Sequence, residues 1–190
     1  GFIRECHGDL HLGNVAFVDG RPVPFDCIEF SAELRWIDVM SEVAFLVMDC
    51  MVRGRDDLAY TFLDTYLEAT GDYAGGALLG FYLVYRSMVR AKVAALQTMR
   101  LDDEELRARF DAHLDFARDR ALHARPAMIL MCGLSGSGKS WLAERLVPQL
   151  PALRVRSDVE RKRLAGLAAT ARSGSTIDAG LYARERSDAV

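Results

Sequence analysis

The alternation of apolar and polar residues divides the chain into short strands near its start and longer helices after them. Three short apolar runs are typical of strands: residues 2–6, 15–18 and 23–25. Asp19-Gly20 separates the last two runs and predicts a hairpin turn. Residues 36–53 are apolar almost throughout, which predicts a helix that is buried on most of its sides.

Helical periodicity continues through much of the remaining chain. Apolar residues recur every three to four positions, which predicts helices over three stretches: residues 56–69, 77–99 and 140–147. The acidic residues 102–105 open another helix, where they complement its positive N-terminus. Arg86 and Arg90 share one face of the 77–99 helix, so they either form ion pairs on its surface or contact an anionic ligand.

The clearest chemical signal is a glycine-rich loop between a predicted strand over residues 127–132 and a predicted helix. Its glycines let several backbone N–H groups converge on a phosphate. Lys139 reaches the β- and γ-phosphates in this pattern, and the Ser140 hydroxyl is a Mg²⁺ ligand. The predicted nucleotide-binding residues are Gly133, Ser135, Gly136, Ser137, Gly138, Lys139 and Ser140.

A second segment of interest follows residues 153–156, which are predicted to form a strand parallel to the first. Asp158 follows this strand, at the edge of a parallel sheet where substrates bind. Residues 157–164 are similar to the corresponding stretch of small P-loop kinases related to gluconate kinase, polynucleotide kinase and zeta-type toxins. That resemblance implies that Asp158 is a catalytic base and that Arg161 holds the acceptor. The alternative is that Asp158 caps the following helix.

The predicted hairpin near the start of the chain brings Asp9, Asn14 and Asp26 close together. In kinase catalytic loops an Asp accepts the proton of the substrate hydroxyl, and an Asn five residues later helps to hold Mg²⁺. Asp9 and Asn14 have this spacing. Asp26 ends the return strand, where a second metal-binding carboxylate is expected.

Residues 7–14, with the sequence His-Gly-Asp-Leu-His-Leu-Gly-Asn, resemble the catalytic motif of aminoglycoside phosphotransferases and choline-kinase-like enzymes. Residues 25–30 and 35–46 resemble that family's metal-binding segment and the helix beneath its catalytic loop. The resemblance covers about residues 1–120 and only the C-terminal lobe of such a kinase. It implies a role for five residues: a catalytic base at Asp9, Mg²⁺ ligands at Asn14 and Asp26, and loop supports at His7 and Asp38.

Two alternatives remain open for this first segment: an inactive kinase lobe, and a turn that His7 and Asp9 merely cap. With the phosphate loop, the patterns predict a mixed α and β protein in two units. Residues 1–123 form a mostly helical, protein-kinase-like C-terminal lobe, and residues 127–190 form a P-loop α/β domain with parallel strands. Arg125-Pro126 marks the boundary. We expect both units to be truncated, because the kinase N-lobe and the later strands of a P-loop domain are absent.

Charge and cysteine content narrow the possible partners and compartment. The formal net charge is −3, which argues against nucleic acid as a partner, and phosphate binding accounts for the basic excess in residues 127–190. The four cysteines have no metal-ligand spacing and each lies in an apolar run, so we expect buried, reduced thiols and a cytoplasmic protein. No signal peptide is visible, and charged residues interrupt the 77–99 segment, so no membrane association is expected.

The predicted function is an ATP- and Mg²⁺-dependent phosphotransferase, a kinase with two nucleotide-binding units that acts on a small-molecule hydroxyl. We expect residues 1–190 alone to be inactive, because both units are truncated. The alternative is a regulatory protein, in which an ATP-binding switch is attached to a non-catalytic kinase-like scaffold. A nucleic-acid end kinase fits the acidic charge less well. The sequence predicts neither the acceptor nor the oligomeric state.

Overall fold

The computed structural model describes residues 1–101, 103–122 and 127–171, and helices make up most of this part of the chain. Before the long helices come six short elements: β1 (Ile3–Glu5), the 3-10 helix η1 (Leu12–Asn14), β2 (Val15–Val18), β3 (Arg21–Pro24), α1 (Ala32–Arg35) and β4 (Trp36–Asp38). The predicted boundary at Arg125-Pro126, Asp102 of the acidic run and everything after residue 171 lie outside the described residues.

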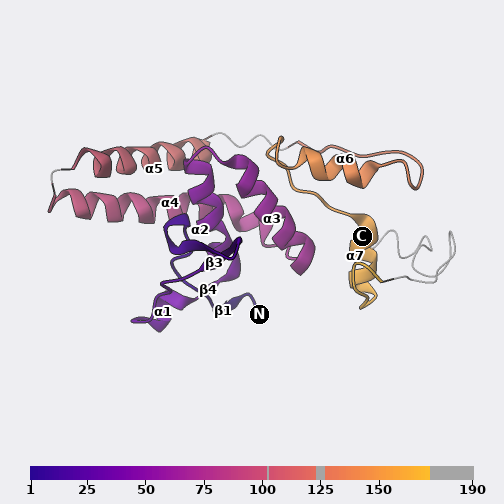
Figure 1. Cartoon of the computed structure of the whole chain (residues 1–190), viewed down its shortest axis with the longest axis horizontal. Coiled ribbons are helices and arrows are strands. Elements are labelled where there is room, and N and C mark those ends of the chain that lie inside the picture. Colours follow the sequence, from indigo (N-terminus) through magenta and orange to yellow (C-terminus); the bar gives the residue numbers. More distant parts are fainter. Residues whose placement is uncertain (102, 123–126, 172–190) are drawn as a thin grey trace.

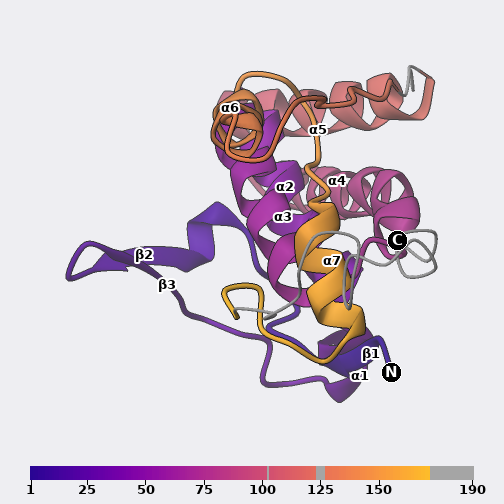
Figure 2. The same ribbon diagram turned by 90° about the vertical axis from the view of Figure 1, so that its right-hand side faces the viewer.

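The described strands form two small antiparallel sheets. Strand β1 pairs with β4, and β2 pairs with β3 as the predicted hairpin. In the hairpin Val15 lies opposite Pro24 and Val18 opposite Arg21, with Asp19 and Gly20 between the strands. Figure 2 shows this hairpin projecting to one side of the helices.

Four long helices follow, and each covers a stretch for which the sequence predicts a helix: α2 (Val39–Val52), α3 (Asp56–Thr70), α4 (Gly76–Thr98) and α5 (Glu104–Leu122). The two longest, α4 and α5, lie side by side, and α2 packs against both α3 and α4 (Figure 1). The core forms around α2, where Phe45, Met40 and Met48 are almost fully buried. Leu63 and Leu67 of α3 complete this cluster, so the apolar run does form a helix buried on most sides.

Two helices of the second unit are described, α6 (Lys139–Leu146) and α7 (Ser157–Leu164). The prediction of parallel strands over residues 127–132 and 153–156 is wrong. Neither stretch is a strand, and no parallel pair occurs among the described residues. A strand persists only when its backbone groups bond to a neighbouring strand. Met128 and Leu130 are instead 82% and 73% exposed, since no described segment pairs with them.

The burial of the cysteines reflects the absence of this predicted sheet from the described chain. All four cysteines are free, and Cys50 is buried and Cys6 and Cys27 are half-buried, in line with the expectation of reduced thiols. Cys132 is exposed, which corrects the prediction that all four are buried. Its apolar neighbours were expected to lie inside a sheet, and this sheet does not form in the described chain.

Candidate functional site

The loop that contains Asp9 is fixed from outside by side chains of α2 and α4. The Gly8 N–H donates to the Glu42 carboxylate, at 3.2 Å from Oε1 and 3.1 Å from Oε2, and Arg86 Nη1 donates to the Gly8 carbonyl at 3.4 Å. Gly8 has φ +85°, and a Cβ there would lie 2.8 Å from the Leu34 carbonyl oxygen. Only glycine fits this position, and Gly8 therefore connects a buried anion to a buried cation.

A second carboxylate of α2 holds the other end of this loop. Asp49 is 3% exposed, and its Oδ2 accepts a hydrogen bond of 2.9 Å from the Leu12 backbone N–H. Glu42 and Asp49 are seven residues apart and so lie on one face of α2. Neither residue was predicted from the sequence to have a role at the site. The available signal was the presence of two acidic residues inside an otherwise apolar helix, because buried charges need partners.

Arg86 and Arg90 both contact the region of the Asp9 loop, a position that neither expectation for them included. Arg86 is buried, and its Nε donates to the backbone oxygen and the hydroxyl of Ser41, each at 3.1 Å. Arg90 Nη1 lies 3.3 Å from His11 Nε2. Both arginines therefore face the Asp9 loop from α4. Burial raises the pKa of Glu42, and the nearby charge of Arg86 opposes that rise.

Within the loop, Asn14 and His11 both approach the same oxygen of Asp9. Asn14 Nδ2 lies 3.2 Å from Asp9 Oδ2 and 3.0 Å from the Asp9 backbone oxygen, and His11 Nε2 lies 3.5 Å from Oδ2. Contact with His11 is the main cause that lowers the pKa of Asp9, although burial opposes it. Both donors contact Oδ2. In the described chain the other oxygen, Asp9 Oδ1, is therefore the one that a substrate could reach.

The tautomer of His11 follows from its neighbours. The Gly13 N–H donates to His11 Nδ1 at 3.0 Å, so Nδ1 of the neutral ring carries no hydrogen. The ring hydrogen is then on Nε2, the nitrogen that faces Asp9 Oδ2. His11 therefore supplies a hydrogen-bond donor to the carboxylate.

Asp26 lies next to this loop through the backbone of the hairpin. The Phe25 N–H donates to the Asn14 carbonyl at 3.0 Å, and the Phe25 carbonyl lies 2.8 Å from His7 Nε2. Asp26 is exposed and has φ 60°, a conformation that costs energy in residues other than glycine. Such an outlier is a reason to suspect a function at this position.

Asp38 contacts its own helix in this structure. It is the N-cap of α2, and its Oδ1 accepts a hydrogen bond of 2.8 Å from the Met40 N–H. Glu42, one helical turn later, makes the side-chain contact with the loop that the resemblance implies for Asp38.

The oxygen atoms at this site suit Mg²⁺ better than a metal that prefers nitrogen or sulfur ligands. No group of three or more His, Cys, Asp and Glu side chains able to hold a metal occurs within the described ranges. Magnesium typically uses only one or two carboxylates and completes its shell with water and phosphate oxygens. Because Asn14 Nδ2 is turned toward Asp9, its Oδ1 points the other way and, with the Asp26 carboxylate, could bind the ion.

The glycine-rich loop forms a tight turn that leads directly into α6. Gly138 is the N-cap, Lys139 and Ser140 are the first two helical residues, and the turn over Ser135 and Gly136 is closed by a 3.2 Å hydrogen bond from the Ser137 N–H to the Leu134 carbonyl. Three glycines have positive φ values, which favour glycine: Gly133 at 146°, Gly136 at 78° and Gly138 at 84°. The sequence prediction for the shape of this loop therefore agrees with the structure.

The Lys139 ammonium group occupies the inside of this loop. Its Nζ donates to the Gly133 carbonyl at 2.7 Å and to the Leu134 carbonyl at 2.6 Å. A cation held beside backbone N–H groups at a helix N-terminus attracts anions. The arrangement can bind a phosphate group if the ammonium turns from the carbonyls toward it.

Asp158 and Arg161 both belong to α7. The N-cap of α7 is Arg156, and Asp158 lies in the first turn, 2.9 Å from Lys162 Nζ. The structure therefore does not support the alternative in which Asp158 is the N-cap of this helix. Arg161 is half-buried one turn later.

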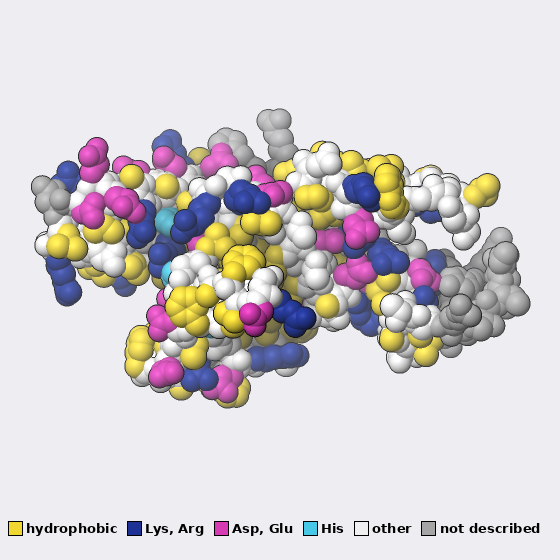
Figure 3. Space-filling model, in the orientation of Figure 1, with side chains coloured by type: hydrophobic (Ala, Val, Ile, Leu, Met, Phe, Trp, Pro, Cys, Tyr) yellow, Lys and Arg dark blue, Asp and Glu magenta, His cyan; other side chains and the backbone are white. Residues whose placement is uncertain are grey.

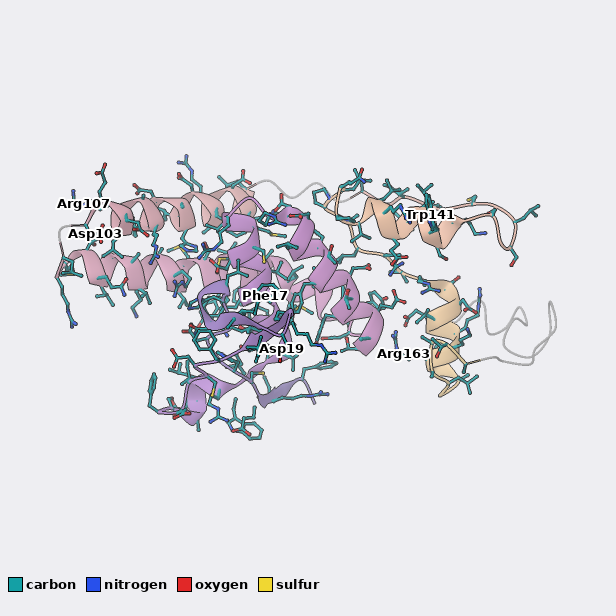
Figure 4. The ribbon with its side chains drawn as sticks, viewed as in Figure 1. Phe17, Asp19, Asp103, Arg107, Trp141 and Arg163 are labelled. Carbon is teal, nitrogen blue, oxygen red and sulfur yellow. The ribbon has the colours of Figure 1, made fainter. Side chains whose placement is uncertain are left out.

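The second unit contacts α3 through arginines on either side of Asp158. Arg154 lies 3.1 Å from Asp64 Oδ2 and 2.5 Å from Glu68 Oε2, and Arg156 lies 2.8 Å from Glu68 Oε1. The Arg154 N–H also donates to Asp64 Oδ1 at 2.9 Å. Arg163 donates to the Glu68 backbone carbonyl, and its place beside α3 can be followed in Figure 4. The two units are joined by this pairing of basic and acidic side chains.

Comparison with known proteins agrees with the phosphate loop. A family described as an AAA domain matches residues 128–189. The matched segment contains the phosphate loop, and the match supports a P-loop type of nucleotide-binding fold for the second unit.

Three curated relatives are each 37% identical over 192 aligned positions that span this whole chain. They are the uncharacterized proteins Mb2027c of Mycobacterium bovis and MT2060 and Rv2004c of Mycobacterium tuberculosis. The chain spans 38% of the length of each of these relatives. No solved structure matches the chain, and none of the described helices is long and apolar enough to cross a membrane.

Proposed function

We propose that the protein is an ATP- and Mg²⁺-dependent phosphotransferase that acts on the hydroxyl group of a small molecule. In this proposal residues 1–123 are a kinase-like catalytic lobe and residues 127–190 a P-loop kinase domain. The phosphate loop carries the proposal: Lys139 begins α6 behind three glycines of positive φ, within the segment that matches the AAA domain family.

In the first unit Asp9 is the proposed base. A substrate hydroxyl oxygen forms a bond to the γ-phosphorus, the bond from that phosphorus to the β–γ bridging oxygen breaks, ADP leaves, and Asp9 Oδ1 takes the hydroxyl proton. The lowered pKa of Asp9 keeps its carboxylate ionised near neutral pH, so that Oδ1 can accept a hydrogen bond from the hydroxyl. Gly8, fixed by Glu42 and Arg86, limits the movement of the base.

Asn14 and Asp26 are the proposed Mg²⁺ ligands in this unit, and Ser140 is the ligand in the other. Magnesium neutralises charge that develops on the transferring phosphate. Asp158 is the proposed acceptor-side base of the P-loop domain, with Arg161 beside it on α7.

The test is direct measurement of phosphate transfer. The full-length protein is incubated with ATP, Mg²⁺ and a panel of sugars, aminoglycosides and nucleosides, and phosphorylated products are identified by mass spectrometry. We expect one acceptor to be phosphorylated with equal release of ADP. Asp9→Asn should reduce turnover about 10²–10⁴-fold if the first unit catalyses the transfer, whereas exposed Asp19→Asn on the hairpin serves as the matched control and should have no effect.

A regulatory ATP switch is the second candidate, and the contact between the units favours it. Arg154 and Arg156 connect the P-loop unit to α3, so a change at the phosphate loop has a route to the kinase-like unit. Nucleotide binding without transfer to any acceptor would contradict the phosphotransferase and support this switch.

A further inference from the structure

The two long helices α4 and α5 enclose a small hollow whose polar lining is basic. Its walls are Arg90, Val93, Ala94 and Gln97 of α4 together with Arg109 and His113 of α5. Two of these side chains are always cationic, one becomes cationic on protonation, and none is acidic. Figure 3 shows a cyan histidine among dark blue basic side chains over these two helices. The space suits one species about the size of a water molecule.

Arg90 has an unused hydrogen-bond donor at this place. Its Nη1 approaches His11, but its Nε is buried and has no hydrogen-bond partner in the described chain. A buried donor without an acceptor destabilises the folded chain. An acceptor inside the hollow would remove this destabilisation.

His113 is the buried titratable group in the wall of the hollow. The ring is 6% exposed, and the Ser87 hydroxyl donates to the His113 carbonyl at 2.8 Å while its oxygen lies 3.2 Å from Nδ1. A hydroxyl has a single hydrogen, so Nδ1 carries the ring hydrogen and donates to Ser87, and Nε2 is the atom that gains a proton. Burial is the main cause that lowers the pKa of His113. The charges of Arg90, Arg53 and Arg109 add to it, and Asp49 opposes them.

We propose that this hollow is a binding site for a small inorganic anion, and that chloride is the ion of suitable size. A water molecule could accept a hydrogen bond from Arg90, and an anion would in addition pair with the charge of this half-buried guanidinium group. Arg109 can contribute, because its 3.4 Å pair with Glu105 joins two well-exposed side chains and is therefore weak. The Gln97 amide offers a further neutral donor.

The site is connected to the Asp9 loop through Arg90, which lines the hollow and also contacts His11. An anion in the hollow would therefore shift a guanidinium group that lies 3.3 Å from the His11 ring. The proposal does not depend on phosphotransfer, and its test needs no substrate.

The experiment follows the His113 and His11 ring signals by NMR in the 190-residue chain, with sodium chloride exchanged for sodium gluconate at constant ionic strength. Chloride should raise the pKa of His113 in a saturable way, because a bound anion favours the protonated ring. It should also raise the melting temperature and shift the His11 signals. Gluconate is too large for the hollow and should do neither.

Arg109→Gln should abolish the saturable response, and Gln97→Leu should weaken it. The matched control is Arg118→Gln, because Arg118 is an exposed arginine of α5 that does not line the hollow. All three positions are exposed, so the variants should fold. Identical His113 titrations in the two salts, or an unchanged chloride response in Arg109→Gln, would overturn the proposal.

Discussion

At the scale of single residues, the candidate site depends on which atom of each polar group is already engaged. Gly13 fixes the hydrogen of His11 on Nε2, and both His11 and Asn14 then lie against Asp9 Oδ2. The carboxylate is thereby held in one orientation, and its other oxygen remains for chemistry. Asp9 and His11 thus act as a pair, in which the ring stabilises the ionised carboxylate.

His11→Leu should raise the pKa of Asp9 toward its ordinary value, because the largest cause of its lowering is lost. A lowered carboxylate pKa contributes stability above the unfolded-state value of about 3.9, and this contribution disappears as the pH falls through the folded-state pKa. The measurement is a pH titration of the Asp9 side-chain carbon by NMR. Asp19→Asn is the control, because Asp19 is an exposed residue at the turn of the hairpin. An unchanged Asp9 titration in His11→Leu would contradict this assignment.

At the scale of elements, α3 is the support on which the second unit lies. Both oxygens of Glu68 are used by arginines from the 154–156 segment, and Asp64 binds the backbone N–H of Arg154. This N–H would otherwise be available to a neighbouring strand. The acidic face of α3 therefore supplies hydrogen-bond and charge partners to this segment, whereas neighbouring strands were expected to supply its partners.

Glu68→Gln should loosen the 153–164 segment, because two arginines lose their counter-charge while the side chain keeps its shape. The contact is partly buried, so we expect a loss of about 1–3 kcal/mol in the free energy that keeps the segment docked. Hydrogen exchange of the peptide over residues 153–164 measures this as faster exchange. Glu33→Gln, at an exposed position of α1, should leave that exchange unchanged. Equal protection in the two variants would mean that the ion pairs do not hold the segment.

At the scale of the whole molecule, the two units for which we propose phosphate chemistry share one interface. The kinase-like loop lies under α2 and α4, the phosphate loop begins α6, and α7 with Asp158 lies near α3 (Figure 1). Lys139 and Asp158 belong to the same unit, but we place them on different sides of the transferred phosphate. Substitutions at these two residues should therefore produce different defects.

Lys139→Ala should weaken ATP binding and abolish transfer together, because the ammonium is the charge on the β- and γ-phosphates. Asp158→Asn should leave ATP affinity nearly unchanged and reduce transfer by the P-loop unit about 10²–10⁴-fold. Calorimetry and turnover of the full-length variants measure both quantities. If Asp158→Asn transfers phosphate normally, the carboxylate has a structural role, to which its 2.9 Å pair with Lys162 contributes.

Local sequence determined the elements whose hydrogen bonds close within a short stretch. The β2–β3 hairpin, the long helices and the turn of the phosphate loop depend on neighbouring residues, and their positions agree with the predictions. The spacing of Asp9 and Asn14 likewise indicated a contact that the structure contains.

Tertiary structure decided everything that needed a distant partner. Glu42, Asp49 and Arg86 hold the Asp9 loop across 34 to 78 residues of sequence. The two acids stand out in an apolar helix, but no local pattern identifies the residues that they contact. Residues 127–132 have the apolar character of a strand but no strand beside them among the described residues, and so they form no strand and most of them are exposed. A helix satisfies its own backbone, whereas a strand or a loop depends on what the rest of the chain brings to it.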